Sequence, residues 1–64
     1  MKFTDAQRAT LARLQAGTDL PPGSTATSIG SPARDGKNII WYRHANPGGY
    51  QLFRITPDGT AHRI

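Results

Sequence analysis

The sequence predicts an α+β protein, in which one N-terminal helix packs on a meander of three or four antiparallel strands. Good helix formers fill residues 4–16, between a capping residue and a glycine. Residues 37–64 hold short runs rich in Ile, Thr and aromatic side chains, separated by turns with Gly and Pro. We expect residues 1–64 to form one domain, with a loop or edge strand over about 18–34 joining the helix to the meander.

The predicted helix has a start signal and a stop signal. Thr4 suits the N-cap position, and Gln7, three residues later, completes a capping box. Asp5 places a negative charge in the first turn, where it interacts favourably with the helix dipole. Gly17 is typical of the position just after a helix. One side of the helix carries a narrow apolar stripe, which suffices for packing on one face of a sheet. The stripe comprises Phe3, Gln7, Leu11 and Leu14.

The connection after the helix contains a candidate edge strand. Residues 20–23 read Leu-Pro-Pro-Gly, and the two prolines exclude helix there. A first strand over about 26–33 would end near Pro32, which confines that strand to an edge of the sheet. The Asp-Gly pair at 35–36 predicts a two-residue hairpin turn into the next strand. The pattern does not decide whether 24–31 is strand or mobile loop.

Two further turns divide the last part of the chain. A four-residue loop over 46–49 would set Ala45 opposite Tyr50. A three-residue Pro-Asp-Gly loop would set Arg54 opposite His62. Because side chains alternate between the faces of a strand, a slip of one residue in either loop would exchange the faces.

This register predicts two unlike sheet faces. The face expected to pack under the helix carries Ile40, Tyr42, His44, Gln51, Phe53, Ile55 and Ala61. The other face carries Ile39, Trp41, Arg43, Tyr50, Leu52, Arg54, His62 and Ile64. The second set mixes aromatic and basic residues, so any function is expected to lie there.

Composition and charge narrow the classes of partner. The net charge is +4 and the sequence isoelectric point is about 10.4, which favours a polyanion or an acidic protein surface. Six of the eight basic residues are arginine, which suits phosphate and carboxylate groups. A GC-rich genome would explain the same arginines without any function.

The chain also lacks several features. With no cysteine there is no disulfide and no thiolate metal site, which fits a reducing compartment. The longest apolar run, 39–42, is too short to span a membrane. The N-terminus has no apolar core of a signal peptide. We therefore expect a cytoplasmic protein without a membrane partner.

No pattern indicates catalysis. At least three of the four aspartates have a local structural role at a helix start or in a turn, so no carboxylate pair is left for acid–base chemistry. His44 and His62 lie on opposite faces in the predicted register, which makes a poor metal site. There is no nucleophile elbow and no phosphate-binding loop. We expect no enzyme activity, no cofactor and no metal.

The aromatic and basic face is the candidate binding site. Bases stack on aromatic rings, and arginines contact phosphates or guanine edges. We therefore predict a small DNA-binding module, and the candidate residues are Trp41, Arg43, Tyr50, Arg54 and His62, with Arg34 and Lys37 at a hairpin tip.

Two alternatives to nucleic-acid binding stay open. The same residue types are enriched at protein interfaces. The protein is therefore alternatively a regulator or inhibitor, of the type of small accessory proteins of phages and mobile elements, that occludes a partner protein, and the same surfaces would support a homodimer. In a purely structural alternative, Trp41 and Leu52 contribute to a second small core beneath the long loop and Leu20. The sequence does not choose between DNA, RNA and protein.

Overall fold

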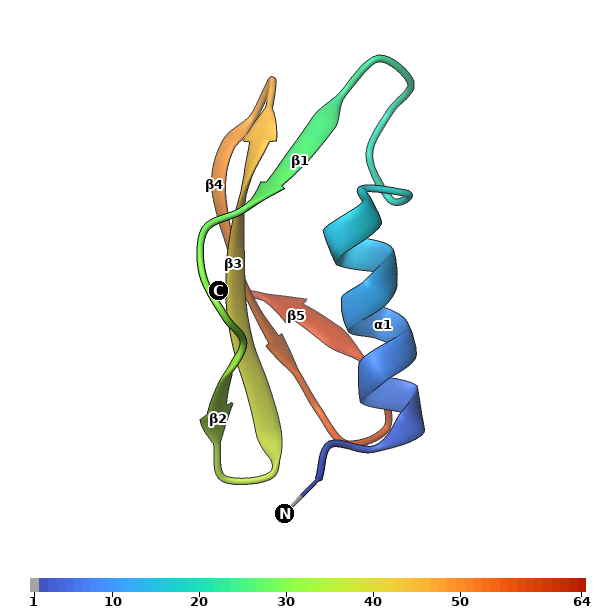
Figure 1. The fold of residues 1–64 in the computed structure, drawn as a ribbon, viewed down its shortest axis with the longest axis vertical. Helices are drawn as coiled ribbons and strands as arrows, with labels where there is room; N and C mark the ends of the chain where they lie inside the picture. Colours follow the sequence, from blue (N-terminus) through green and yellow to red (C-terminus); the bar gives the residue numbers. More distant parts are fainter. Residues whose placement is uncertain (1) are drawn as a thin grey trace.

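The computed structural model describes residues 2–64 and has two layers, one helix and one sheet (Figure 1). Helix α1 spans Asp5–Ala16. The antiparallel sheet has five strands, which are β1 (Thr25–Ser28), β2 (Ala33–Asp35), β3 (Asn38–Asn46), β4 (Gly49–Ile55) and β5 (Ala61–Arg63). Helix α1 covers one face of the sheet, and no described element covers the other (Figure 1). The predicted α+β class with an N-terminal helix is confirmed.

Helix α1 begins at the predicted capping box. The Gln7 N–H donates to Thr4 Oγ1 at 3.0 Å, and the Thr4 N–H donates to Gln7 Oε1 at 2.9 Å. The helix ends at Gly17, whose φ of 75° lies in the left-handed region that suits glycine. The Gln7 side chain is buried, and its Nε2 donates to the carbonyls of Lys37 (2.7 Å) and Ile55 (3.1 Å). This amide therefore ties the first turn of the helix to the sheet.

Strands β1 and β2 pair one after the other with the same edge of β3. Four residues, 29–32, connect β1 to β2. On β3, the residues that pair with the ends of these two strands, Arg43 and Ile40, are separated by only two residues, so the connection bulges out of the sheet. The Trp41 indole N–H donates to the Gly30 carbonyl in this bulge at 3.2 Å. The prediction of one strand over 26–33 was wrong, because four residues facing two cannot continue the ladder.

The hairpin between β2 and β3 forms at the predicted place. Asp35 pairs with Asn38, so Gly36 and Lys37 make the two-residue turn. Gly36 has a φ of 62°, which the turn requires. The turn places Lys37 at one end of the sheet.

The predicted register between β3 and β4 was wrong by one residue. Ala45 pairs with Gly49 rather than with Tyr50. Three residues, 46–48, therefore lie between the two members of this pair, whereas the prediction had four. Gly48 and Gly49 have φ values of 132° and 83°, and this glycine pair lets the chain reverse in the shorter loop. The shift turns every side chain of β3 to the face opposite to the predicted one.

The second hairpin has the predicted register. Arg54 pairs with His62, and Ile55 pairs with Ala61. The Thr56 N–H donates to the Thr60 carbonyl at 3.0 Å and closes the turn between β4 and β5. The alternation of β4 was therefore predicted correctly, with Phe53 and Ile55 on the helix side.

The core lies between α1 and the centre of the sheet. Its buried cluster comprises Leu14, Ile39, Trp41, Phe53 and Ile55, with Phe3 and Leu11 packed against it. The Trp41 and Phe53 rings stack with centroids 6.3 Å apart. In the described part of the chain, no helix has the length and apolar character that crossing a membrane requires.

Candidate functional site

Two of the predicted binding residues lie in the interior instead of on the surface. Trp41 is 2% exposed and Arg43 is 1% exposed, and both face α1. The one-residue change of register between β3 and β4 is the cause, because it turns Ile39, Trp41 and Arg43 inward. Trp41 joins the main core, so the alternative of a second core with Leu52 was also wrong.

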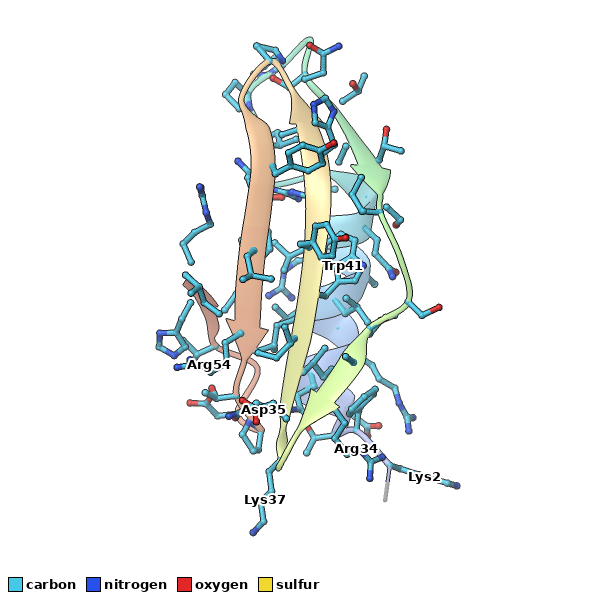
Figure 2. All side chains as sticks on the ribbon, turned by 90° about the vertical axis from the view of Figure 1, so that its left-hand side faces the viewer. Lys2, Arg34, Asp35, Lys37, Trp41 and Arg54 are labelled. Carbon is cyan, nitrogen blue, oxygen red and sulfur yellow. The ribbon has the colours of Figure 1, made fainter. Side chains whose placement is uncertain are left out.

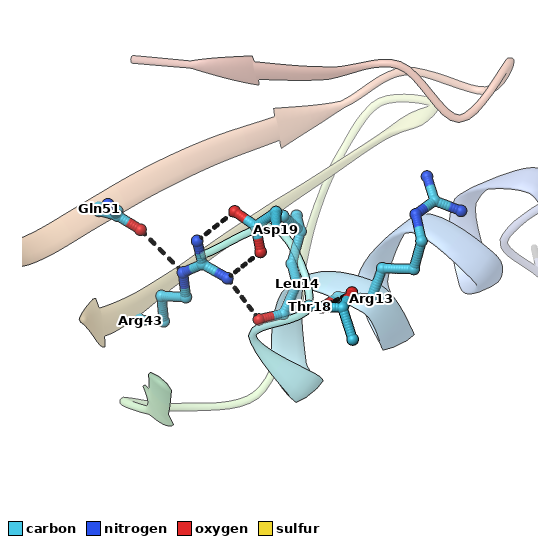
Figure 3. A network of polar contacts seen from close by, with 6 residues as sticks. All are labelled: Arg13, Leu14, Thr18, Asp19, Arg43 and Gln51. Carbon is cyan, nitrogen blue, oxygen red and sulfur yellow. Dashed lines mark hydrogen bonds and ion pairs between the residues drawn. The ribbon is translucent and has the colours of Figure 1, made fainter. Parts of the chain in front are cut away.

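The Arg43 guanidinium is held by several parts of the chain (Figure 3). Its Nη1 and Nη2 donate to the Asp19 carboxylate at 2.9 and 2.6 Å, a bidentate ion pair. Nη1 also donates to the Leu14 carbonyl at 2.5 Å, and Nε donates to Gln51 Oε1 at 2.8 Å. The Phe53 ring lies 5.0 Å from the guanidinium carbon. These bonds occupy four of the five guanidinium N–H groups, and the side chain is 1% exposed, so Arg43 acts within the fold and is not presented to a ligand.

The ion pair also changes the titration of its acid. The hydrogen bond from Arg43 lowers the pKa of the Asp19 carboxyl below its ordinary value of 3.8. Asp19 was the aspartate without a local structural role in the sequence. Nothing in the local sequence around Asp19 indicates its pairing with Arg43, 24 residues away.

On the uncovered side of the sheet, seven residues of β3, β4 and β5 form what we call the open face. It consists of Ile40, Tyr42 and His44 from β3, Tyr50, Leu52 and Arg54 from β4, and His62 from β5. Across the strands, Tyr42 pairs with Leu52, and His44 pairs with Tyr50. None of these seven residues is acidic, but Asp35 of β2 pairs with Asn38 and so lies on the same side of the sheet, at its hairpin end. Figure 2 views the sheet from this side, with α1 behind it.

Two aromatic side chains on the open face are accessible to a ligand. Tyr50 is 71% exposed and Tyr42 is 43% exposed. The His44 ring meets the Tyr50 ring edge-on with centroids 5.0 Å apart, which orients the tyrosine. Ile40 and Leu52 are half-buried between the polar side chains. The open face therefore offers an apolar and aromatic surface at the Asn46 end of β3.

The cations gather toward the other end of the sheet. Arg54 lies on the open face, and Lys37 and Arg34 lie at the β2–β3 hairpin, with Lys2 nearby (Figure 2). Arg34 lies 5.5 Å above the Phe3 ring. Asp35, the last residue of β2, and Asp58, in the β4–β5 turn, offset part of the charge at this end. Of the eight basic residues of the chain, Arg43 is buried and the other seven are exposed.

Two features that a metal or substrate site would require are absent from the described residues. Within residues 2–64, no group of three or more potential ligands is placed to hold a metal ion, and no pocket is present. The Asp58 carboxylate accepts from the Thr56 hydroxyl and from the Thr60 N–H, and these bonds lower its pKa below 3.8. The acid thus organises a turn.

The predicted site residues now separate into two groups. Tyr50, Arg54 and His62 lie on the open face as predicted, and Lys37 is exposed at the hairpin near its basic end. Arg34 is also exposed, but it pairs with Ile39 and lies on the helix side of the sheet, above the Phe3 ring. Tyr42 and His44 also lie on it, although the predicted register had placed them under the helix. Strict alternation along β3 would have found them, had the loop length been known.

No family model, no curated protein and no solved structure matches this chain. The fold and the site together define a one-helix α+β protein whose sheet carries an uncovered aromatic and basic face.

Proposed function

We propose that this protein is a small, non-catalytic module that binds nucleic acid through the open face. The observation that carries the proposal is the uncovered side of the sheet, where Tyr42, Tyr50 and Arg54 are exposed. Among the strand residues, Asp35 alone is acidic, and it lies at the hairpin end of this side. The net charge of +4 supports a polyanionic ligand.

The proposed contacts follow from the chemistry of these side chains. Base–aromatic stacking contributes about 1–3 kcal/mol per base, and it tolerates any sequence because every base has a π-face. Arg54 and Lys37 would contact phosphates, which position a nucleic acid without reading its sequence. Arg34 pairs with Ile39 and lies on the helix side of the sheet, so it is not among the proposed contacts. Trp41 and Arg43 support this surface from beneath and do not contact the ligand.

A binding measurement with a matched charge control tests the proposal. Labelled DNA and RNA oligonucleotides are titrated with the protein at about 50 and 200 mM salt, where the affinity should fall steeply as salt rises. Arg54→Ala should weaken binding and reduce the salt slope by about 1. Arg8→Ala removes the same charge from α1, on the covered side, and should leave binding nearly unchanged. Absence of binding at the lower salt refutes the proposal.

A second candidate is a regulator that binds and occludes an acidic protein partner. The observation in its favour is apolar exposure near an open strand edge. Strand β5 pairs with residues 53–55 of β4, and the Ile64 N–H donates to the Leu52 carbonyl. The outer edge of β4 beside Tyr50 therefore has no neighbouring strand among the described residues. Ile64 is 60% exposed. Such an edge accepts an added strand.

The substitution Ile64→Lys separates the two candidates. It removes an exposed apolar side chain and adds a cation. Nucleic-acid binding should therefore be unchanged or stronger, whereas docking of a protein on this apolar edge should weaken. The readouts are the oligonucleotide titration and the retention of a co-purified partner from the host.

A further inference from the structure

We infer that the ligand of the open face is an unpaired strand, whose bases stack on Tyr42 and Tyr50 while its phosphates run toward Arg54 and Lys37. This inference rests on the proposed function and specifies its substrate class. It is drawn from the order of side chains along the sheet.

The exposed rings favour unpaired bases. In a duplex the π-face of each base is covered by its neighbours, so a flat aromatic side chain has no base to stack on. Tyr50 is 71% exposed and Tyr42 is 43% exposed. They lie on neighbouring strands in a diagonal arrangement, because Tyr42 pairs with Leu52 and Tyr50 pairs with His44. Both rings are thus available on one surface.

The centre of the open face is poorly suited to reading a duplex. A sheet in the major groove distinguishes base pairs with hydrogen-bond donors and acceptors. Here Leu52 lies at the middle of the face and Ile40 lies beside Arg54, which is the one residue of the seven with a guanidinium fork. Aliphatic side chains instead pack against the faces and sugars of splayed nucleotides. The central residues therefore agree with single-strand binding.

The cations give the site a direction. Tyr50 pairs with His44 and Arg54 pairs with Ile40, so four residues of β4 separate the two levels. At about 3.3 Å per residue this distance is roughly 13 Å. Lys37 extends the basic end further, at the tip of the β2–β3 hairpin (Figure 2). A sheet surface of this length suits about two or three stacked nucleotides.

The test compares strandedness on the intact protein. Fluorescence anisotropy is recorded with labelled oligo(dT) and oligo(U) of about 12 nucleotides and with a duplex of the same length, at about 50 mM salt. We expect a single strand to bind at least about tenfold more tightly than the duplex. The DNA and RNA arms show which sugar is preferred.

Ring substitutions assign the contact. Tyr50→Leu should weaken single-strand binding about tenfold or more, whereas Tyr50→Phe, which retains the ring, should bind within about threefold of the parent protein. Neither change is expected to unfold the domain, because Tyr50 is exposed. Trp41, which is buried, reports folding of each variant through its fluorescence.

Each outcome has a distinct consequence. Equal or tighter binding of the duplex overturns the single-strand inference and leaves the proposed function standing. Binding of neither form overturns both. A single-strand preference that Tyr50→Leu does not weaken overturns the assignment of the contact to the tyrosine.

Discussion

Arg43 and Trp41 are neighbours on one face of β3, and both contribute to the interior in different ways. Trp41 supplies apolar area and a ring that stacks on Phe53. Arg43 supplies a cation that bonds to the end of α1, to the following loop and to β4. In a domain this small, an arginine with four of its five N–H groups bonded fills space that apolar side chains would otherwise occupy.

Replacing Trp41 is expected to unfold the protein. Truncating a buried Trp to Ala costs about 3–5 kcal/mol. A single core in a domain of fewer than about 70 residues seldom supplies more than 3–5 kcal/mol in total. Trp41→Ala should therefore lose its cooperative unfolding transition in circular dichroism.

The adjacent position provides the control for Trp41. Tyr42 belongs to the same strand, points to the open face and is 43% exposed. Tyr42→Ala should change the free energy of unfolding by no more than about 1 kcal/mol. If Trp41→Ala melts like Tyr42→Ala, the burial described for Trp41 is refuted.

At the scale of elements, α1 is attached at both ends. Its first turn bonds to the sheet through Gln7, and Thr4 Oγ1 donates to the Pro57 carbonyl at 2.7 Å. Its middle bonds to the β4–β5 turn, where Thr10 Oγ1 donates to the Gly59 carbonyl at 2.5 Å. Its last turn is held by Arg43. Side-chain to backbone bonds thus supplement the narrow apolar stripe.

The contact between α1 and the β4–β5 turn is testable at Gly59. A Cβ there would lie 2.9 Å from the Ala6 carbonyl oxygen, and φ is +87°. Gly23 has nearly the same φ, +86°, but a Cβ there meets nothing within 4 Å. Gly23→Ala should cost about 1–2 kcal/mol from the left-handed backbone alone. Gly59→Ala should cost at least about 1 kcal/mol more, from the close packing.

Urea unfolding of the two glycine variants measures this difference directly. The two glycines have nearly the same φ. Subtracting the loss of stability of Gly23→Ala from that of Gly59→Ala therefore isolates the packing of the turn against the helix. Equal losses of stability would mean that α1 moves away from the turn without cost, contrary to the close approach observed.

At the scale of the whole molecule, one helix on one side of the sheet leaves an elongated shape, 35 × 17 × 16 Å. The core is correspondingly small, and the ion pair between Asp19 and Arg43 joins the loop after α1 to the middle of the sheet. The free energy of unfolding should therefore depend on whether the Asp19 carboxylate is charged.

This dependence gives an expected pH profile. The pKa of Asp19 is lower in the folded protein than in the unfolded chain, because Arg43 bonds to the carboxylate. The contribution to stability is complete above about pH 5 and is lost as pH falls through 3.8 and then through the lower folded-state pKa. The midpoint of thermal unfolding should fall in that window. Asp58, whose pKa is also lowered, adds to the same loss.

Two variants resolve the contribution of Asp19. Asp19→Asn should be less stable than the parent protein at pH 7, and the difference should shrink toward acid pH, where the parent carboxyl is protonated. Asp35→Asn is the control, because in the described part of the chain the Asp35 carboxylate accepts no hydrogen bond from a side chain or backbone N–H. If the difference in stability between Asp19→Asn and the parent protein is the same at every pH, the proposed role of the ion pair is contradicted.

The helix and the second hairpin were predictable because their signals are local. The capping box of Thr4 and Gln7 and the stop at Gly17 each depend on a few neighbouring residues. The turn at 57–59 has one favoured loop length, so the pairing of Arg54 with His62 followed from it. Half of the candidate site was predicted for the same reason, since Tyr50, Arg54 and His62 all lie on these strands.

The other half of the site depended on tertiary structure. Strand β3 carries large side chains on both faces, so its alternation alone does not say which face is buried. The loop of three rather than four residues decided this, and with it the burial of Trp41 and Arg43 and the exposure of Tyr42 and His44. No local pattern links Asp19 to Arg43 either, 24 residues apart. Composition and local signals thus determined the fold class, whereas register and long-range pairing, which require the packed chain, decided what the open face presents.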